Sequence, residues 1–245
     1  ITDAAIERFE AETGIDVTID VYDSNETLEA RLLAGSTGFD IVVPTGNFMA
    51  RQIAAGVHQP LNKDLLPNMS NMDPALMGRS ARFDPDNAHS TIYMWGTTGI
   101  GYNIDAIAER LGEDYEVNSW DLVFNPETAA KVADCGISFL DSADEMLPPA
   151  LAYLGLNPES RETADLEAAA ALLGSVREHV RYFHSSQYIS DLANGETCVA
   201  VGFSGDVFQA AARAEEAGQG VNVWYAIPQE GAQVWFDMLV IPSDA

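Results

Sequence analysis

The chain has 245 residues, of which 47% are hydrophobic and 20% are charged, so it can bury the core of one large or two modest domains. Its 12 Lys and Arg residues against 38 Asp and Glu residues give a formal charge of −26, which disfavours nucleic acids and anionic membranes as partners and favours cations. No apolar run approaches the roughly 20 residues of a membrane span, and net charge alone locates no site, because a solvated acidic surface accounts for most of it.

The opening third alternates between helical and strand patterns. The predicted order is a helix over residues 1–12, a strand over 15–22 with period-two alternation, a helix from a capping box at 23–26 to Gly35, a strand over 39–43, and a helix from Asn47 to Gly56. This alternation predicts a parallel sheet in an α/β fold. Residues 58–90 are rich in Pro, Asn, Asp and Met, which indicates long loops with short helices.

A second α/β block follows an extended crossover at residues 93–103, where we expect a domain boundary. Predicted helices cover residues 104–111, 126–133, 144–154, 163–179 and 207–217, and predicted strands cover 137–140, 199–202, 221–227 and 233–241. Because the chain starts within a helix and ends just past a strand, we expect both ends of the fold to be truncated.

Asp237 is the most informative residue, because the apolar strand around it offers no group that could neutralise a buried carboxylate. Its partner is either an internal Arg or Lys or the cation of a ligand, and the scarcity of basic residues favours the ligand. Strand alternation puts Trp235 on the same face, where an indole suits the methylenes and charge of an alkylammonium.

Two other acids have structural and functional interpretations. Asp206 follows the strand 199–202, where ligands bind in open α/β sheets, but with Gln209 it also fits a helix capping box. Glu145 can complete a capping box with Ser142, and capping is the simpler interpretation there.

Signatures of enzymes and metal sites are absent from the sequence. There is no G-x-S-x-G, P-loop or G-x-G-x-x-G motif, and no histidine pair has metal-ligand spacing, so we expect no catalytic residue, no metal and no cofactor. Cys135 and Cys198 are too few for a zinc site. They either pair, which requires an oxidising compartment, or remain buried thiols.

Five blocks resemble the polyamine-binding receptors of ABC transporters, the putrescine receptors above all. They are residues 9–14, 24–26, 34–44, 94–103, which include Met94-Trp95-Gly96-Thr97-Thr98-Gly99, and 183–188. The resemblance implies a two-lobed periplasmic binding protein type II fold with a hinge, closing over a linear polyamine. Lobe 1 would comprise residues 1–95 plus 232–245, and lobe 2 residues 96–231.

The resemblance also implies the ligand-binding residues and the setting. By it, Asp206, Asp237 and Glu145 bind amines, Trp235 and Phe203 form aromatic walls, and Thr45 takes the place of a serine near an amine. Phe203 departs from the usual Trp, which weakens the cation-π face. The cysteines match a disulfide pair, which implies a periplasmic location.

The expected function is therefore to capture a polyamine, most simply putrescine, and deliver it to an ABC permease, as a monomer and not as an enzyme. One alternative is a sensor of polyamine or another organic cation that feeds a signalling partner. An alternative of another class is an amine-processing enzyme on a similar fold, which would need a nucleophile or an acid-base pair near the ligand.

Overall fold

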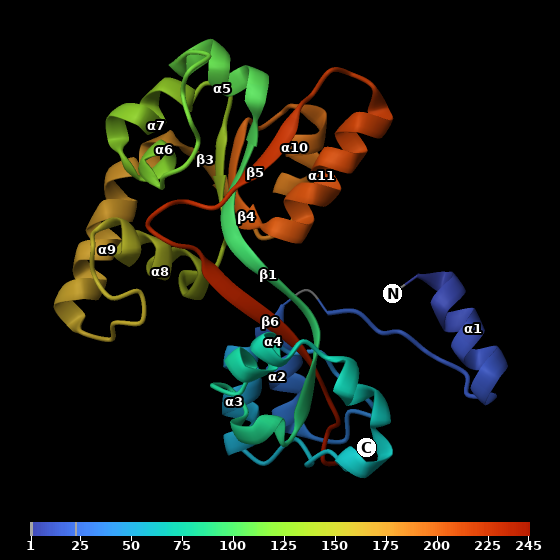
Figure 1. The fold of residues 1–245 in the computed structure, drawn as a ribbon. Coiled ribbons are helices and arrows are strands. Elements are labelled where there is room, and N and C mark those ends of the chain that lie inside the picture. The colour runs from blue at the N-terminus through green and yellow to red at the C-terminus, as the bar shows by residue number, and fades with distance from the viewer. Residues whose placement is uncertain (1, 23) are drawn as a thin grey trace. The chain divides into compact units, whose positions relative to one another are not determined.

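A computed structural model describes residues 2–22 and 24–245 and confirms the predicted α/β class. The chain divides into two compact units, which we describe separately (Figure 1). Unit 1 comprises residues 1–93 and 237–245, and unit 2 comprises residues 94–236. Two strands, β1 (Ser90–Asn103) and β6 (Gln233–Val240), pair with each other and continue from one unit into the other.

The sheet of unit 2 has the strand order β3-β2-β4-β1-β5. Its remaining strands are β2 (Ile137–Phe139), β3 (Val180–Phe183), β4 (Val199–Phe203) and β5 (Val223–Ala226). β2 runs parallel to β3 and β4, whereas β1 runs antiparallel to β4 and β5, with Ile100 opposite both Val201 and Ala226. The sheet of unit 2 is therefore mixed, with both parallel and antiparallel neighbours.

Helices cover both faces of this sheet: α10 and α11 lie on one face, and α6, α7 and α9 on the other (Figure 1). The helices of unit 2 are α5 (Ile104–Leu111), α6 (Asp121–Phe124), α7 (Pro126–Val132), α8 (Ala143–Tyr153), α9 (Thr163–Val176), α10 (Tyr188–Asn194) and α11 (Ser204–Ala217), with a 3-10 turn η4 at Arg177–His179. The predicted helices match five of these elements, and α6, β3 and α10 were not predicted.

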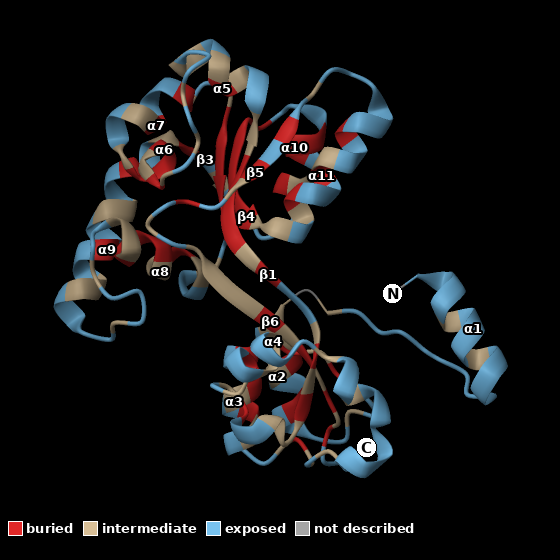
Figure 2. Ribbon diagram, in the orientation of Figure 1, coloured by how far each residue is buried: buried red, intermediate tan, exposed pale blue. Residues whose placement is uncertain are grey.

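The core of unit 2 lies between the sheet and these helices, where residues 98–101 of β1 and 199–202 of β4 are buried (Figure 2). Trp120, Phe124 and Phe139 are at most 1% exposed, and the ring of Phe124 stacks on Trp120 at 5.4 Å and meets Phe139 edge-on at 6.0 Å. Full burial of each such side chain stabilises the fold by about 1.5–3 kcal/mol. The candidate site residues of this unit thus lie on elements that pack against this core.

Unit 1 is mainly helical in its described part. It contains α1 (Asp3–Thr13), α2 (Asn25–Ala34), α3 (Gly46–Ala54) and α4 (Pro74–Ser80), with 3-10 turns η1 (Lys63–Leu65), η2 (Pro67–Asn71) and η3 (Pro85–Asn87). Ser24 is the N-cap of α2 and accepts a hydrogen bond from the backbone of Thr27 at 3.1 Å, one residue after Asp23, where the predicted capping box begins and which lies outside the described residues. Leu28 and Leu32 are buried, as their helical spacing predicts.

The end of β6 is anchored in unit 1 by the segment that precedes α3. Val42 and Val240 exchange two backbone hydrogen bonds of 3.0 and 3.1 Å, and the Met238 amide donates to the Pro44 carbonyl at 3.0 Å. This antiparallel pairing sets Thr45 opposite Asp237. Two segments that are nearly 200 residues apart in the chain therefore fix one candidate ligand residue each.

Two strands that the sequence predicts in unit 1 do not form ladders. Residues 15–22 are assigned to no strand, and residues 39–43 contribute only the isolated bridge at Val42. The apolar members of the first segment, Ile15, Val17, Ile19 and Val21, are 38–80% exposed. Period-two alternation marks a segment that can pair, but a strand needs a neighbour, and the described residues of unit 1 supply none here.

Candidate ligand-binding site

Asp237 carries the candidate charge of unit 1. Burial alternates along β6, with Phe236, Met238 and Val240 buried and Trp235 and Asp237 only partly buried, so the last two share a face as predicted. Burial raises the pKa of the Asp237 carboxyl group to about 6. Among the described residues, no basic side chain forms an ion pair with it. The internal Arg or Lys that was the alternative is therefore not found in that part of the chain.

Tyr22 lies near this carboxylate and was missed by the sequence interpretation. Burial and the charge of Asp237 raise the pKa of its hydroxyl group to about 12. The hydroxyl group donates its single proton to the carbonyl of Val43, so it does not donate to Asp237. Thr45 is held by its amide, which donates to the Asn25 side chain at 3.0 Å. The structure thus brings Thr45, Tyr22 and Asp237 together within unit 1.

The two predicted aromatic walls meet in unit 2. The rings of Phe203 and Trp235 pack edge to face, with centroids 5.8 Å apart and planes at 83°. The indole lies directly over Gly96, where a Cβ atom would stand only 2.3 Å from Trp235 Cζ2. The buried indole N–H has no hydrogen-bond partner among the described residues. Gly96 therefore belongs to the aromatic site because only a glycine leaves room for the indole.

Asp206 lies in the first turn of α11, and its carboxylate accepts a hydrogen bond of 2.7 Å from the Tyr188 hydroxyl. Burial raises the pKa of Asp206, and the Tyr188 hydrogen bond and the charge of Arg213 oppose this shift. The capping-box alternative with Gln209 is wrong. The helix begins at Ser204, two residues before Asp206, and its N-cap Phe203 has no side-chain cap.

Glu145 lies in the first turn of α8, and its carboxylate is held by the crossover strands. The Thr98 hydroxyl on β1 donates to one oxygen at 2.6 Å, and the Gln233 amide on β6 donates to the other at 3.3 Å. The N-cap Ser142 makes no side-chain cap hydrogen bond, which argues against the capping interpretation. Glu145 is thus tied to β6 two residues before Trp235.

The structure therefore gathers the predicted residues into two sets, one in each unit. Unit 2 holds Glu145, Phe203, Asp206 and Trp235, connected through Thr98, Gln233 and Tyr188. Unit 1 holds Thr45 and Asp237. The unit 1 set contains one carboxylate, and the unit 2 set combines two carboxylates with two aromatic rings, a combination that suits ammonium groups joined by methylenes.

Other kinds of site find no support in the described residues. No three His, Cys, Asp or Glu side chains gather there into a group that could hold a metal ion. None of the helices described is both long and apolar enough to cross a membrane.

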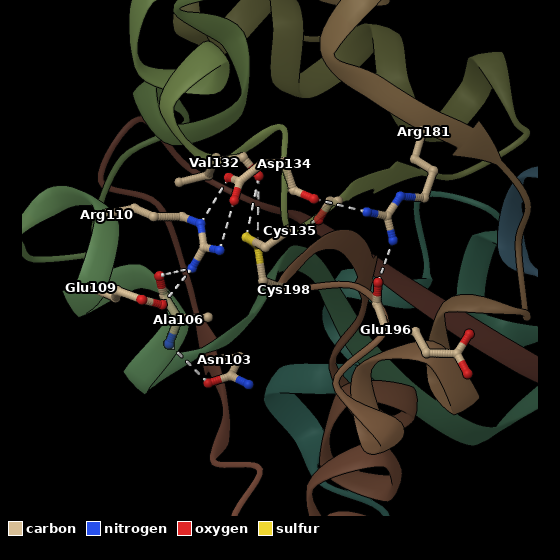
Figure 3. The surroundings of a disulfide bond; sticks show 11 residues. Asn103, Ala106, Glu109, Arg110, Val132, Asp134, Cys135, Arg181, Glu196 and Cys198 are labelled. Atoms are coloured by element: carbon tan, nitrogen blue, oxygen red, sulfur yellow. Dashed lines mark hydrogen bonds and ion pairs between the residues drawn. A yellow bond between two sulfur atoms is a disulfide. The ribbon is translucent and has the colours of Figure 1, made fainter.

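A disulfide bond joins Cys135 and Cys198 in unit 2 (Figure 3). Their Cα atoms are 5.5 Å apart, and the Cys198 amide lies within hydrogen-bonding distance of the Cys135 and Gly136 carbonyls, at 3.2 Å from each. Around it, Arg110 pairs with the Asp134 carboxylate at 2.8 Å, and Arg181 donates to the carbonyls of Asp134 and Glu196. The paired state of the two cysteines is confirmed, and buried free thiols are excluded.

Comparison with known proteins gives matches over nearly the whole chain. The family model described as bacterial extracellular solute-binding protein matches residues 4–245. The putrescine-binding periplasmic protein SpuD of Pseudomonas aeruginosa (strain UCBPP-PA14) is 55% identical over 240 residues, and the putrescine-binding periplasmic protein PotF of Escherichia coli (strain K12) is 53% identical over 241 residues. Each alignment covers 98% of this chain but 65% of the relative, so the chain spans about two thirds of their length.

Solved structures of substrate-binding proteins also align with nearly the whole chain. The spermidine/putrescine transporter substrate-binding protein PotD of Streptococcus pneumoniae superimposes with a TM-score of 0.81 at 26% identity, over 100% of this chain and 70% of that one. The Tp0655 (TpPotD) lipoprotein of Treponema pallidum superimposes with a TM-score of 0.84 at 28% identity, over 99% of this chain and 72% of that one.

Proposed function

We propose that this chain, which belongs to the family of bacterial extracellular solute-binding proteins, captures a small polyamine and delivers it to the permease of an ABC transporter. Putrescine is the first candidate, because two relatives above 50% identity are named for binding it. A periplasmic location is part of the proposal, since those names describe periplasmic proteins and the Cys135–Cys198 bond would persist only in an oxidising compartment. We also infer that the receptor is a monomer.

One observation carries this proposal: Asp237 is a partly buried carboxylate, with a pKa that burial raises to about 6, and it has no ion-pair partner among the described residues. Removing a carboxylate from water costs free energy unless a cation compensates for it. The ammonium group of a ligand would supply that cation. Asp206 and Glu145 would receive other ammonium groups or share one.

Aromatic packing gives the proposed site its preference for a linear chain. The faces of Trp235 and Phe203 would contact methylene groups, and the electron-rich indole face attracts an ammonium group. Selectivity would come from amine spacing, because a misplaced ammonium leaves a desolvated carboxylate unpaired. No bond is made or broken in this scheme.

Isothermal titration calorimetry of the chain with putrescine, cadaverine, spermidine and spermine tests the proposal. We expect putrescine to bind in the micromolar range or tighter, with PotF of Escherichia coli as the positive control. 1,4-Butanediol has the same four methylenes without ammonium groups and should give no heat. Absence of binding to all four polyamines would overturn the proposal, and chemical conversion of bound putrescine would point instead to the enzyme alternative.

The pH dependence of putrescine affinity follows from Asp237. Its folded pKa is raised to about 6, so the carboxylate is charged at pH 7.5 and largely neutral at pH 5. Since only the charged form attracts an ammonium group, affinity should fall as pH decreases through about 6, by up to about tenfold per pH unit below it. Titrations at pH 5, 6 and 7.5 measure this. Constant affinity across that range would contradict a role for Asp237.

A further inference from the structure

We propose that Tyr188 is a positioning residue for polyamine binding, because its one hydroxyl group connects the carboxylate of Asp206 to the backbone of the aromatic wall Phe203. This inference rests on the proposed function and adds a specificity-determining contact to it. Tyr188 ends the block at residues 183–188 that resembles the receptors, but the resemblance gives its hydroxyl group no role.

The direction of the Tyr188 hydroxyl proton is fixed by its two partners. The side chain is 0% exposed at the start of α10, and its oxygen accepts a hydrogen bond of 3.0 Å from the Phe203 amide. The same oxygen lies 2.7 Å from Asp206 Oδ2. A hydroxyl group has a single proton, and the amide can only donate, so that proton points to the carboxylate. The hydroxyl group of Tyr188 therefore donates to Asp206, and its direction is set by the hydrogen bond from the Phe203 amide.

The two partners of Tyr188 lie at the junction of β4 and α11. Phe203 is the last residue of β4 and the N-cap of α11, and Asp206 lies in the first turn of that helix. One buried hydroxyl thus determines the spacing between the proposed aromatic wall and the proposed acid. The backbone amide of the N-cap residue Phe203 donates its hydrogen bond to the Tyr188 hydroxyl group and not to the Asp206 carboxylate.

Gly202 is the residue that admits the tyrosine ring. A Cβ atom at this position would stand 2.5 Å from Tyr188 Cε2 and 2.8 Å from Cζ. Because the glycine is itself buried in β4, a larger residue would displace either the ring or the strand. Position 202, four residues before Asp206, therefore requires glycine because the Tyr188 ring approaches closely, and not because of its backbone dihedral angles.

The hydrogen bond also acts on the charge of Asp206. Burial raises the pKa of this carboxyl group, whereas the Tyr188 hydroxyl and the charge of Arg213 lower it. Burial and the charges of Asp206 and Tyr225 raise the pKa of Tyr188 well above its usual value, so it remains a donor at all physiological pH values. Without the hydroxyl group the pKa of Asp206 would be higher, so its carboxyl group would stay neutral up to a higher pH and would attract an ammonium group less strongly.

A double-mutant cycle tests the proposal, with Tyr188→Phe, Asp206→Asn and the double variant titrated with putrescine. Tyr188→Phe keeps the ring and removes only the hydroxyl. We expect it to weaken binding about tenfold at pH 7.5, as for loss of one hydrogen bond to a charged group, and to move the acid limb of the pH profile to higher pH. In the Asp206→Asn background the same change should alter affinity less than about twofold.

The outcomes separate this inference from the proposed function. If the wild-type chain fails to bind putrescine, the proposed function fails. If it binds, and Tyr188→Phe has an equal effect in both backgrounds with an unmoved pH profile, Tyr188 is only a core residue and the inference fails. Circular dichroism and thermal denaturation establish that each variant is folded.

Two glycine variants provide an independent check. Gly202→Ala forces the ring away from its position and should also weaken putrescine binding about tenfold or more. Gly205→Ala lies in the same junction, but its added methyl group meets no atom within 4 Å, so binding should stay within about twofold. An equal loss of affinity in both variants would overturn the specific role of the ring position.

Discussion

Replacing Asp237 with asparagine should weaken putrescine binding by about 100-fold or more at pH 7.5. Truncating or neutralising one partner of a desolvated charge pair typically costs about 2–5 kcal/mol, because the other charge is left buried and unpaired. Asparagine keeps the shape of the side chain, so the change isolates the charge. Calorimetry with putrescine measures the loss, and competition with a tighter polyamine extends the range.

Asp114→Asn is the matched control for charge. Asp114 is exposed and lies outside both candidate sets, so its substitution removes one unit from the net charge of −26 without touching them. Its putrescine affinity should stay within about twofold of the wild type, since exposed charges interact weakly at physiological salt. Equal affinities for Asp237→Asn and Asp114→Asn would show that the general acidity of the chain, and not Asp237, attracts the ligand.

The same Asp237→Asn substitution should stabilise the ligand-free protein at neutral pH. The folded pKa of about 6 lies above the unfolded value of about 3.9, so the unfolded state loses its proton first as pH rises. The free energy of unfolding therefore falls between about pH 4 and pH 6 and stays reduced above it. Partial solvent exposure discounts the cost to roughly 1–3 kcal/mol, which the variant should recover.

Denaturation by urea across pH measures this difference. Wild type and variant should be equally stable near pH 4 and should separate as pH rises through 6, with the variant more stable at pH 7.5. Saturating putrescine should reverse the order, because only the wild type gains binding free energy. A variant that is less stable at pH 7.5 would mean that the Asp237 carboxylate stabilises the fold, and then it would not be reserved for a ligand.

The candidate acid that the sequence identifies on physical grounds is Asp237, because its signal is local. A carboxylate inside an apolar strand is visible in eight consecutive residues, and alternation alone predicts that Trp235 shares its face. For the same reason α2 and α5 were predicted almost to the residue, since their caps and apolar stripes are contained in a short window. Local patterns translate directly into local structure.

The contacts that orient the acids were not predictable, because they join distant parts of the chain. Thr98 reaches Glu145 across 47 residues, and Tyr188 reaches Asp206 across 18. Neither separation corresponds to the repeat of a helix or a strand, and the sequence does not distinguish this tyrosine from an ordinary core residue. Asp206 fitted a helix cap because the sequence places the start of this helix at residue 207, whereas the helix begins at Ser204. A shift of that size moves the carboxylate from the N-cap into the first turn.

The failure of the strand at residues 15–22 has a related cause. Period-two alternation states which face would be buried, but a ladder requires a second strand in register. The same rule explains the success of β6, which has similar alternation and finds partners in β1 and in Val42–Thr45. Strand pairing therefore depends on a second segment, and the pattern of one segment alone does not predict it.

Removing the Cys135–Cys198 disulfide should lower the free energy of unfolding by about 4 kcal/mol. The bond closes a loop across 63 residues, and constraining the unfolded chain over that length is worth about 4 kcal/mol in the chain-entropy model. That is a large fraction of the 5–15 kcal/mol that holds a typical domain together. The folded state should change little, because the Cys198 amide stays close to the Cys135 and Gly136 carbonyls in either case.

Urea denaturation of the Cys135→Ala/Cys198→Ala variant measures this loss, and reductant provides the control. Dithiothreitol should destabilise the wild type by a similar amount and should leave the double variant unchanged, which separates the bond from the packing of the sulfur atoms. Putrescine affinity of the folded variant should stay within about twofold, since the bond lies in neither candidate set. A stability loss below about 1 kcal/mol would mean that the unfolded chain is already compact across this loop, so that its closure adds little.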